Sequence, residues 1–114
     1  MTLLAALAIT ASANAQIPQR TEGDVQQAKK EIRRLWGTSA PRVFCIIQRE
    51  SGWNPRAVSR TGDHGLMQLN AYTWRRYFGK RWARVYDPVA NVRMGYAVYK
   101  RQGWGAWRGG RWAC

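Results

Sequence analysis

A chain of 114 residues provides one small domain and little more, because a hydrophobic core needs most of that length. Its 19 lysine and arginine residues outnumber 6 acidic residues, and the formal net charge of +13 points to an anionic partner such as cell-wall polymer, nucleic acid or anionic lipid. No apolar run reaches the roughly 18 residues that cross a bilayer, so no membrane span is expected.

The N-terminal segment, Met1–Ala15, has the pattern of a secretory signal peptide. Leu3–Ala11 is a short apolar run, and the Ala-Asn-Ala that follows is a small-residue cleavage pattern, so the mature domain is expected at 16–114. The usual basic residues ahead of the apolar run are missing, which leaves open a start further upstream. A secreted or periplasmic location in the cell envelope follows from this interpretation, and an N-terminal core helix is the alternative.

Two helices are predicted in the first half of the mature chain. The first takes Asp24 as its N-cap, runs to about Trp36 and stops at Gly37. The second takes Ser39 as its N-cap and has Pro41 in its first turn, where a missing N–H costs nothing. The apolar face of the first helix comprises Val25, Ala28, Ile32 and Leu35.

Glu50 has an unusual place in the second helix. Across Arg42–Ser51, at about 100° per residue, it falls on the same stripe as Val43 and Ile46. Loss of water on that stripe and the negative end of the helix dipole, close to the stop at Gly52, both favour the protonated form. A carboxyl group kept neutral can donate a proton, as a general acid must. The simpler alternative is a glutamate whose stem packs while its head reaches solvent.

The second half of the chain predicts a loop, a short segment and two more helices. Trp53–Asp63 is a loop by composition, and Gly65–Leu69 is too short for more than a strand fragment or a turn. The result is a compact, mostly helical domain with one irregular stretch between its helices. The caps and ends of the two helices are Asn70 and Phe78 for the first, and Asp87 and Gly103 for the second.

Cys45 and Cys114 are the two cysteines of the chain. Because an export signal implies an oxidising compartment, the two residues are expected to form a disulfide. This bond would tie the last residue to the helix that carries Glu50. Closing so long a loop contributes roughly 4 kcal/mol in the chain-entropy model. Two buried free thiols are the alternative.

Two motifs carry a family resemblance: Glu-Ser-Gly at 50–52 and Gly-Leu-Met-Gln-Leu-Asn at 65–70. Together they resemble the soluble lytic transglycosylase and c-type lysozyme superfamily. The resemblance covers Arg42–Cys114 and implies a mainly α, lysozyme-like α+β fold with a short irregular or β segment beside the active-site cleft. Asp87, Pro88, Asn91 and Gly95 are similar to the later helix of the transglycosylases, whereas the Cys-x4-Glu spacing and Trp104-Gly-Ala-Trp107 are similar to c-type lysozyme.

The resemblance implies a role for Glu50 as the catalytic acid that protonates the glycosidic oxygen between MurNAc and GlcNAc in peptidoglycan. Gly65–Asn70 would form the cleft wall, with an amide from Gln68 near the sugar. Asn70 would either donate to a sugar or cap its helix. Trp104 matches the lysozyme tryptophan that desolvates the catalytic acid, and Trp107 is expected in the core. The substrate-binding candidates are Ser51, Gln68, Asn70, Tyr96 and Trp104.

Asp63 separates two glycosidase mechanisms. It falls where c-type lysozymes carry a second carboxylate, so Glu50 and Asp63 could be the pair of a retaining muramidase. Lytic transglycosylases generally use one glutamate, first as acid and then as base on the 6-hydroxyl of the sugar, and they release a 1,6-anhydro product. The Gly-Leu-Met-Gln signature favours the transglycosylase, although the Ala-Tyr-Asn motif of that family is missing. A turn residue is the alternative for Asp63.

Peptidoglycan glycan strands are the expected partner, together with anionic cell-wall polymers, and a monomer is expected. No nucleic-acid motif is present, so nucleic acid is not favoured. No cluster of histidine, cysteine or acidic residues has metal-ligand spacing, so neither a metal nor a cofactor is expected, and His64 is expected in a turn or at the surface. The other class of function is a non-catalytic cationic protein that binds glycan or envelope through its arginines and aromatic residues.

Overall fold

Helices account for most of the chain in the computed structural model, which describes residues 21–108 and 114. The longer helices are α1 (Glu22–Trp36), α2 (Ala40–Ser51), α3 (Ala71–Phe78) and α4 (Pro88–Gln102). Short 3₁₀ turns accompany them: η2 (Gly37–Ser39), η3 (Gly79–Arg84) and η4 (Gly103–Trp107). Strands β1 (Asp63–His64) and β2 (Leu69–Asn70) form a small antiparallel sheet. The prediction of a mainly α fold with a short β segment is confirmed.

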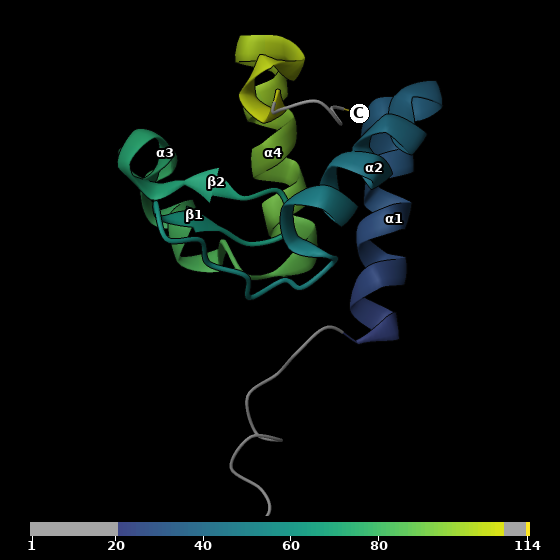
Figure 1. Ribbon diagram of the computed structural model, residues 1–114, viewed down its shortest axis with the longest axis horizontal. Coiled ribbons are helices and arrows are strands. Elements are labelled where there is room, and N and C mark those ends of the chain that lie inside the picture. The colour runs from purple at the N-terminus through teal and green to yellow at the C-terminus, as the bar shows by residue number, and fades with distance from the viewer. Residues whose placement is uncertain (1–20, 109–113) are drawn as a thin grey trace, which may run out of the picture.

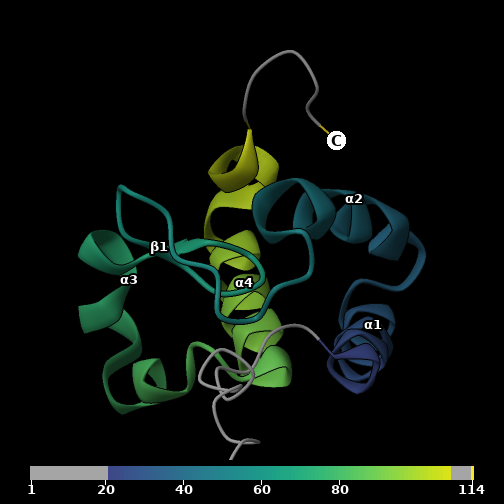
Figure 2. The same ribbon diagram turned by 60° about the horizontal axis from the view of Figure 1, so that its bottom comes forward.

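The elements are arranged around α4. Figures 1 and 2 show α4 between α1 and α2 on one side and α3 with the two strands on the other. In the small sheet, Asp63 pairs with Asn70 and His64 with Leu69. The strands and α3 therefore form one wall of the molecule, and the end of α2 lies across from them.

The start of α1 differs from the prediction. Thr21 is the N-cap, and its side chain accepts a hydrogen bond of 3.0 Å from the Asp24 backbone N–H. The carboxylate of Asp24 accepts in return from the Thr21 N–H at 3.4 Å. Asp24 was wrongly predicted as the cap, because this reciprocal arrangement is a capping box, in which an acid at the third helical position supports the cap residue. The stop at Gly37 is confirmed.

The start and the end of α2 lie where they were predicted, with Ser39 at the N-cap position, but the expected capping hydrogen bond is missing. Ser39 makes no capping hydrogen bond, because its φ of −88° and ψ of 1° continue the η2 turn rather than the extended backbone of a cap. Pro41 stands in the first turn, as predicted. At the other end, the N–H of Gly52 donates to the carbonyls of Gln48 and Ile47 and closes the helix. Glu50 accordingly lies in the last turn.

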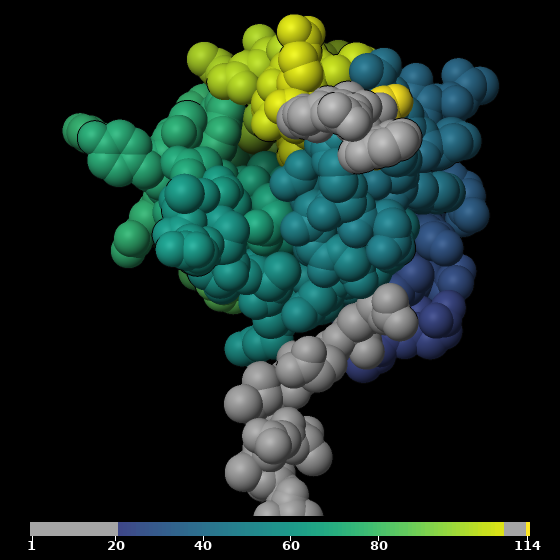
Figure 3. All heavy atoms as spheres, in the orientation of Figure 1, coloured from purple at the N-terminus to yellow at the C-terminus, as the bar shows by residue number. Residues whose placement is uncertain are grey.

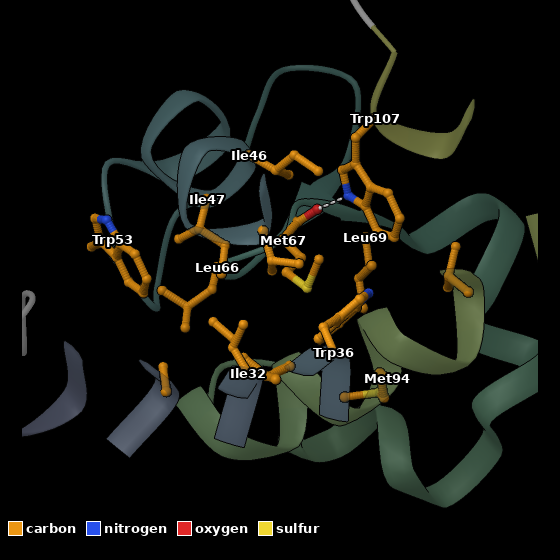
Figure 4. Close-up of a cluster of buried hydrophobic side chains, with 14 of the residues drawn as sticks. Ile32, Trp36, Ile46, Ile47, Trp53, Leu66, Met67, Leu69, Met94 and Trp107 are labelled. Carbon is orange, nitrogen blue, oxygen red and sulfur yellow. Dashed lines mark hydrogen bonds between the residues drawn. The ribbon is translucent and has the colours of Figure 1, made fainter. Parts of the chain in front are cut away.

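The segment between the two strands is inserted into the core. Leu66 and Met67 are fully buried, as predicted, and they lie between α2 and α1 (Figure 4). Ile47 approaches them from α2 and Ile32 from α1, and both of these side chains are also fully buried. This burial fixes the segment as part of the core, so the polar residues beside it are held in definite positions.

Asn91 of α4 clamps the same segment. Its Oδ1 accepts from the Met67 N–H at 2.8 Å, and its Nδ2 donates to the carbonyls of Val85 at 2.8 Å and His64 at 3.2 Å. A Cβ on Gly65, whose φ is +79°, would come 2.2 Å from Asn91 Nδ2, and one on Gly95 would come 2.3 Å from Met67 Sδ. The motif residues Gly65, Asn91 and Gly95 thus share one structural cause, the close approach of α4 to this segment.

The predicted disulfide is confirmed. Cys45 and Cys114 are bonded, with a Cα–Cα distance of 5.8 Å across a sequence separation of 69. The bond attaches residue 114 to α2. In the described part of the chain, no helix is long and apolar enough to cross a membrane. The predicted signal peptide, Met1–Ala15, lies outside the described residues.

Candidate active site

The end of α2 is joined to the segment between the strands. Ser51 Oγ donates to the carbonyl of Leu66 at 2.8 Å and lies 3.2 Å from the carbonyl of Ile47. This bond connects the Glu-Ser-Gly motif to the Gly-Leu-Met-Gln motif, so the two motifs that carry the resemblance lie together in space. The contact gives Ser51 a positioning role, and its sugar contact stays a prediction.

Glu50 is paired rather than isolated. Its side chain is 27% exposed, and Oε2 accepts from Arg49 Nη2 at 3.0 Å and from Arg49 Nε at 3.3 Å. The expectation that this carboxyl group is shielded from water is not met, because the side chain stays partly exposed in the last turn of α2 and is paired with the preceding arginine. The alternative, a glutamate whose stem packs while its head reaches solvent, fits this arrangement better. Sequence reasoning missed Arg49 as a part of the site.

Trp107 is bonded both to the segment between the strands and to Arg49. Its Nε1 donates to the carbonyl of Met67 at 2.8 Å, and its own carbonyl accepts a hydrogen bond from Arg49 Nη2. The ring is buried over Met67 and Leu69 (Figure 4). Trp107 is therefore a core residue, as predicted, and it also links η4 and the segment between the strands to the partner of Glu50.

Trp104 and Tyr96 have aromatic and cationic packing partners. The Trp104 ring is 4.4 Å from the ring of Tyr99 and 4.5 Å from the guanidinium of Arg42, in the first turn of α2. Tyr96 meets the ring of Trp36 edge-on at 4.9 Å, on the side of α4 that faces α1. The roles that the resemblance implied for both residues at the substrate stay predictions.

Asp63 holds the turn that connects the loop to β1. Its Oδ2 accepts from Ser59 Oγ at 2.6 Å and from Thr61 Oγ1 at 2.7 Å, and its Oδ1 accepts from Asn70 Nδ2 at 3.0 Å. Burial raises the pKa of Asp63, but these three hydrogen bonds outweigh it and bring the pKa below its ordinary value of 3.8. An ionised carboxylate with both oxygens occupied favours the turn interpretation of this residue.

The amides of Asn70 and Gln68 shape the same wall. Asn70 Oδ1 accepts from the Thr73 N–H at 3.0 Å, which confirms that Asn70 caps α3. Gln68 has a φ of 53°, and its Nε2 donates to the carbonyls of Ala57 and Gly65, both at 3.1 Å. The NH₂ group of Gln68 is therefore directed at backbone, and that of Asn70 at the Asp63 carboxylate and the Thr61 carbonyl, so contacts with a sugar stay predictions for both residues.

A cavity of about 250 Å³ opens along this wall. Gln68 and Asn70 line it from the strands, Trp74 from α3, Gln102 from α4 and Trp107 from η4. Figure 3 shows the surface hollowed between α3 on one side and the α2 and η4 side on the other. We call this hollow the cleft. Glu50 is not one of the residues that line the cleft; its neighbour Arg49 is linked to the cleft through the carbonyl of the lining residue Trp107.

His64 belongs to an aromatic cluster below the cleft. Its Nδ1 is 2.7 Å from the hydroxyl of Tyr86, and its ring meets that of Trp82 edge-on at 5.6 Å. His64 was expected in a turn or at the surface, and it stands half-buried in β1, because its backbone continues the small sheet. Across residues 21–108 and 114, no group of three or more potential ligand side chains could hold a metal ion.

Glu31 is a buried acid that sequence reasoning missed. Its side chain is 10% exposed and accepts from Arg34 Nε at 2.9 Å and from Arg93 Nε at 2.6 Å. The hydrogen bond from Arg34 is the largest influence and, together with Arg93, it outweighs burial and lowers the pKa of Glu31 to about 2. Arg34 lies one helical turn from Glu31, so this pair could be predicted from the sequence. The bond from Arg93 joins α4 to α1, and no local sequence pattern predicts it.

Known proteins resemble most of the described chain. Residues 27–103 match the family model described as the transglycosylase SLT domain. The endo-type membrane-bound lytic murein transglycosylase A of Citrobacter koseri is 34% identical over 92 residues, which cover 74% of this chain and 45% of that protein. The protein of the same name from Salmonella paratyphi B is 33% identical over 92 residues with the same coverage. The chain thus spans less than half the length of these relatives. No solved structure matches it.

Proposed function

Because the chain belongs to the transglycosylase SLT domain family, we propose that it is a lytic transglycosylase that cleaves the MurNAc–GlcNAc bond of peptidoglycan. The relatives it matches are named for activity on murein. The observation that carries the proposal is the bond from Ser51 to Leu66, which holds the last turn of α2, with Glu50, against the segment that walls the cleft.

The proposed reaction uses Glu50 twice. As a general acid it gives its proton to the glycosidic oxygen while the bond from MurNAc C1 to that oxygen breaks. As a carboxylate it then accepts the proton of the MurNAc 6-hydroxyl while O6 bonds to C1 and closes the 1,6-anhydro ring. The proton that Glu50 lost is thereby restored, and no water is consumed.

Arg49 has a clear part in this scheme as a positioning residue. Two of its nitrogens hold Oε2 of Glu50, and its contact with the Trp107 carbonyl fixes the guanidinium against η4. When Glu50 gives up its proton, the negative charge that develops is already faced by a cation, so the charged intermediate is stabilised. The same contact limits the rotation of the carboxylate, which supports correct orientation toward the sugar.

A second carboxylate is not required by this proposal. The oxygens of Asp63 are engaged by Ser59, Thr61 and Asn70, which supports a structural role for Asp63 and favours the single-glutamate reaction over the muramidase alternative. The disulfide between Cys45 and Cys114 supports a location outside the cytoplasm, in the periplasm or secreted, where such bonds persist.

The test is digestion of purified peptidoglycan sacculi, followed by turbidity and by mass spectrometry of the released fragments. We expect the wild type to release fragments with 1,6-anhydro ends, and Glu50→Gln to release none. Glu22→Gln is the matched control, because Glu22 is exposed in the first turn of α1, and it should act as the wild type does. Equal clearing by Glu50→Gln would overturn the proposal. Binding to sacculi without any release by the wild type would favour the non-catalytic alternative.

A further inference from the structure

The solvent face of α3 carries a fully exposed aromatic residue, which two arginines follow one turn later in the helix. Tyr72 is 99% exposed, and Arg75 and Arg76 follow it on the same face of the helix at spacings of three and four residues. The opposite face holds the buried rings of Trp74 and Phe78, so the packing of α3 is complete without Tyr72. A large ring held entirely in water next to cations is typical of a binding surface.

A second hollow, of about 620 Å³, lies against this face. Tyr72, Arg75 and Arg76 line one side of it, and the Thr61–Gly62 turn with Ala71 lines the other. Figure 3 shows the side chains of α3 standing out from the body of the molecule beside the hairpin turn. The volume lies in the range of ligand sites, and the walls offer a ring face and two guanidinium groups.

The second hollow continues the cleft. The cleft is lined by Asn70 and Thr73, which flank Ala71 and Tyr72 in the first turn of α3. The turn between them is held in place, because Ala71 N–H donates to the Gly62 carbonyl at 2.9 Å and Asn70 Nδ2 donates to the Thr61 carbonyl at 3.2 Å. A polymer that leaves the cleft across the start of α3 would therefore run over Tyr72.

The charge of the second hollow is uncompensated. Within the described ranges, neither Arg75 nor Arg76 forms an ion pair, and the nearest acid of the turn, Asp63, is occupied by Ser59, Thr61 and Asn70. The surface is thus complementary to a ligand that combines flat rings with carboxylates. Peptidoglycan has this combination, since its strands are chains of sugar rings whose MurNAc residues carry stem peptides that end in carboxylates.

We propose that Tyr72, Arg75 and Arg76 form a distal site for the same glycan strand, where the phenol ring stacks on a sugar and the guanidinium groups pair with stem-peptide carboxylates. The inference rests on the proposed function and names a second contact of the same substrate. Arginine and carboxylate form paired, charge-assisted hydrogen bonds that fix orientation as well as affinity. Because the site lies away from Glu50, it favours long strands over short fragments.

The test measures sedimentation of the protein with insoluble sacculi in the Glu50→Gln background, so that binding is separated from cleavage. We expect Tyr72→Ala and the pair Arg75→Gln with Arg76→Gln each to weaken binding by about fivefold, whereas Tyr72→Phe keeps the ring and binds as the parent does. Lys30→Gln with Lys80→Gln removes the same charge from exposed positions of α1 and η3 and is the matched control. Unchanged binding by both Tyr72→Ala and the arginine pair would overturn the inference.

A second arm uses sacculi in which the carboxylates on the stem peptides of the glycan strands have been converted to neutral amides. The loss caused by the arginine pair should disappear on these strands, while the loss caused by Tyr72→Ala remains. A loss from the arginine pair that persists would overturn the assignment to carboxylates and point to another anionic polymer of the wall. In a background with Glu50 intact, Tyr72→Ala should cleave short soluble muropeptides at the wild-type rate and sacculi about fivefold more slowly.

The two proposals can fail separately. If Glu50→Gln is inactive and the Tyr72 and arginine variants bind sacculi as the parent does, only the distal site is wrong. If Glu50→Gln still clears sacculi, the proposed function is wrong whatever the binding results. Because these side chains are exposed on α3, thermal unfolding should be the same for all variants.

Discussion

Two glutamates of this protein stand on helices beside arginines, and their surroundings differ. Glu31 on α1 is 10% exposed and is held by two arginines from α1 and α4. Glu50 on α2 is 27% exposed, and among the described residues its ion-pair partner is Arg49. The first is fixed as an anion between two helices, and its pKa of about 2 keeps it charged at any physiological pH. The second retains access to solvent and substrate.

The two glutamates differ in what their surroundings leave open. A carboxylate held by two cations from separate helices joins those helices and stays ionised near neutral pH, so it has no proton to donate. Glu50 has a partly exposed side chain, as the proposed acid and base role requires. The comparison is therefore between an acid that holds the fold and an acid for which a role on substrate is proposed.

The largest expected effect is on activity, from Glu50→Gln. The amide keeps the size of the side chain but cannot donate and recover a proton, so we expect cleavage of sacculi to fall by about 10³-fold. The free energy of unfolding should change by less than about 0.5 kcal/mol, because the side chain is partly exposed. The check is initial rates of muropeptide release with denaturant unfolding of the same samples. A large loss of stability would mean that activity fell for structural reasons.

The next effect is on stability, from Glu31→Gln. Without its anion, Arg93 and Arg34 face each other across the helices, and we expect the free energy of unfolding to fall by about 2 kcal/mol. Cleavage measured well below the unfolding temperature should stay within about twofold of the wild type, since the side chain lies between α1 and α4. Guanidinium unfolding and the sacculus assay together give the answer. If cleavage fell by much more than twofold at a temperature where the variant is folded, the assignment of Glu31 to stability rather than to catalysis would be contradicted.

In the wild-type protein, acidification should remove the stabilisation that the Glu31 carboxylate contributes to the fold. The folded-state pKa of Glu31 is lowered from 4.5 to about 2, so the carboxylate stabilises the fold above pH 4.5 and this stabilisation is lost as the pH falls toward 2. Since Arg34 and Arg93 are 61% and 62% exposed, solvent screens the pairs and we expect a loss of about 1–2 kcal/mol. Unfolding curves of the wild type and of Glu31→Gln should converge over this range. A difference that stays constant from pH 6 to about pH 2 would contradict the assignment.

The smallest effects are expected from substitutions of the arginines that pair with the two glutamates. Arg49→Gln should lower kcat by about tenfold with little change in KM, because it removes the group that orients Glu50 and faces its charge. Arg93→Gln should leave kcat unchanged and lower the free energy of unfolding by about 1 kcal/mol. Kinetics on soluble glycan fragments and thermal unfolding separate these effects. If Arg49→Gln and Arg93→Gln changed kcat equally, the proposed difference in role between Glu50 and Glu31 would be contradicted.

Local signals in the sequence were enough for most of the fold. The ends of the helices follow from Gly37, Gly52, Gly79 and Gly103, and the caps of α3 and α4 from Asn70 and Asp87, because each acts within one turn of the chain. The start of α1 was missed because Thr21 and Asp24 are both good caps, three residues apart, and the capping box uses both. Ser39 is the N-cap residue of α2 as predicted, but its side chain makes no capping bond because η2 continues the helical backbone through it.

The candidate site was predicted in outline and not in detail. The motif spacing predicted that Glu50 and the segment at 65–70 would come together, and the bond from Ser51 to Leu66 shows how. The bond from Trp107 to Met67 depends on how η4 turns after α4, and Trp104, three positions earlier in the sequence, packs on Tyr99 instead. The pairing of Arg49 with Glu50 depends on the Trp107 carbonyl, 58 residues away, which no local pattern encodes.

The most direct test of the central claim is to digest sacculi in water enriched in heavy oxygen and to weigh the new sugar ends. If Glu50 closes the ring with the 6-hydroxyl of the substrate, the released ends carry no heavy oxygen and are lighter by one water than a hydrolysis product. Glu50→Gln, folded as the wild type is, releases no such ends. Heavy oxygen at the new ends of the wild-type product, or the same products from Glu50→Gln, would contradict the account.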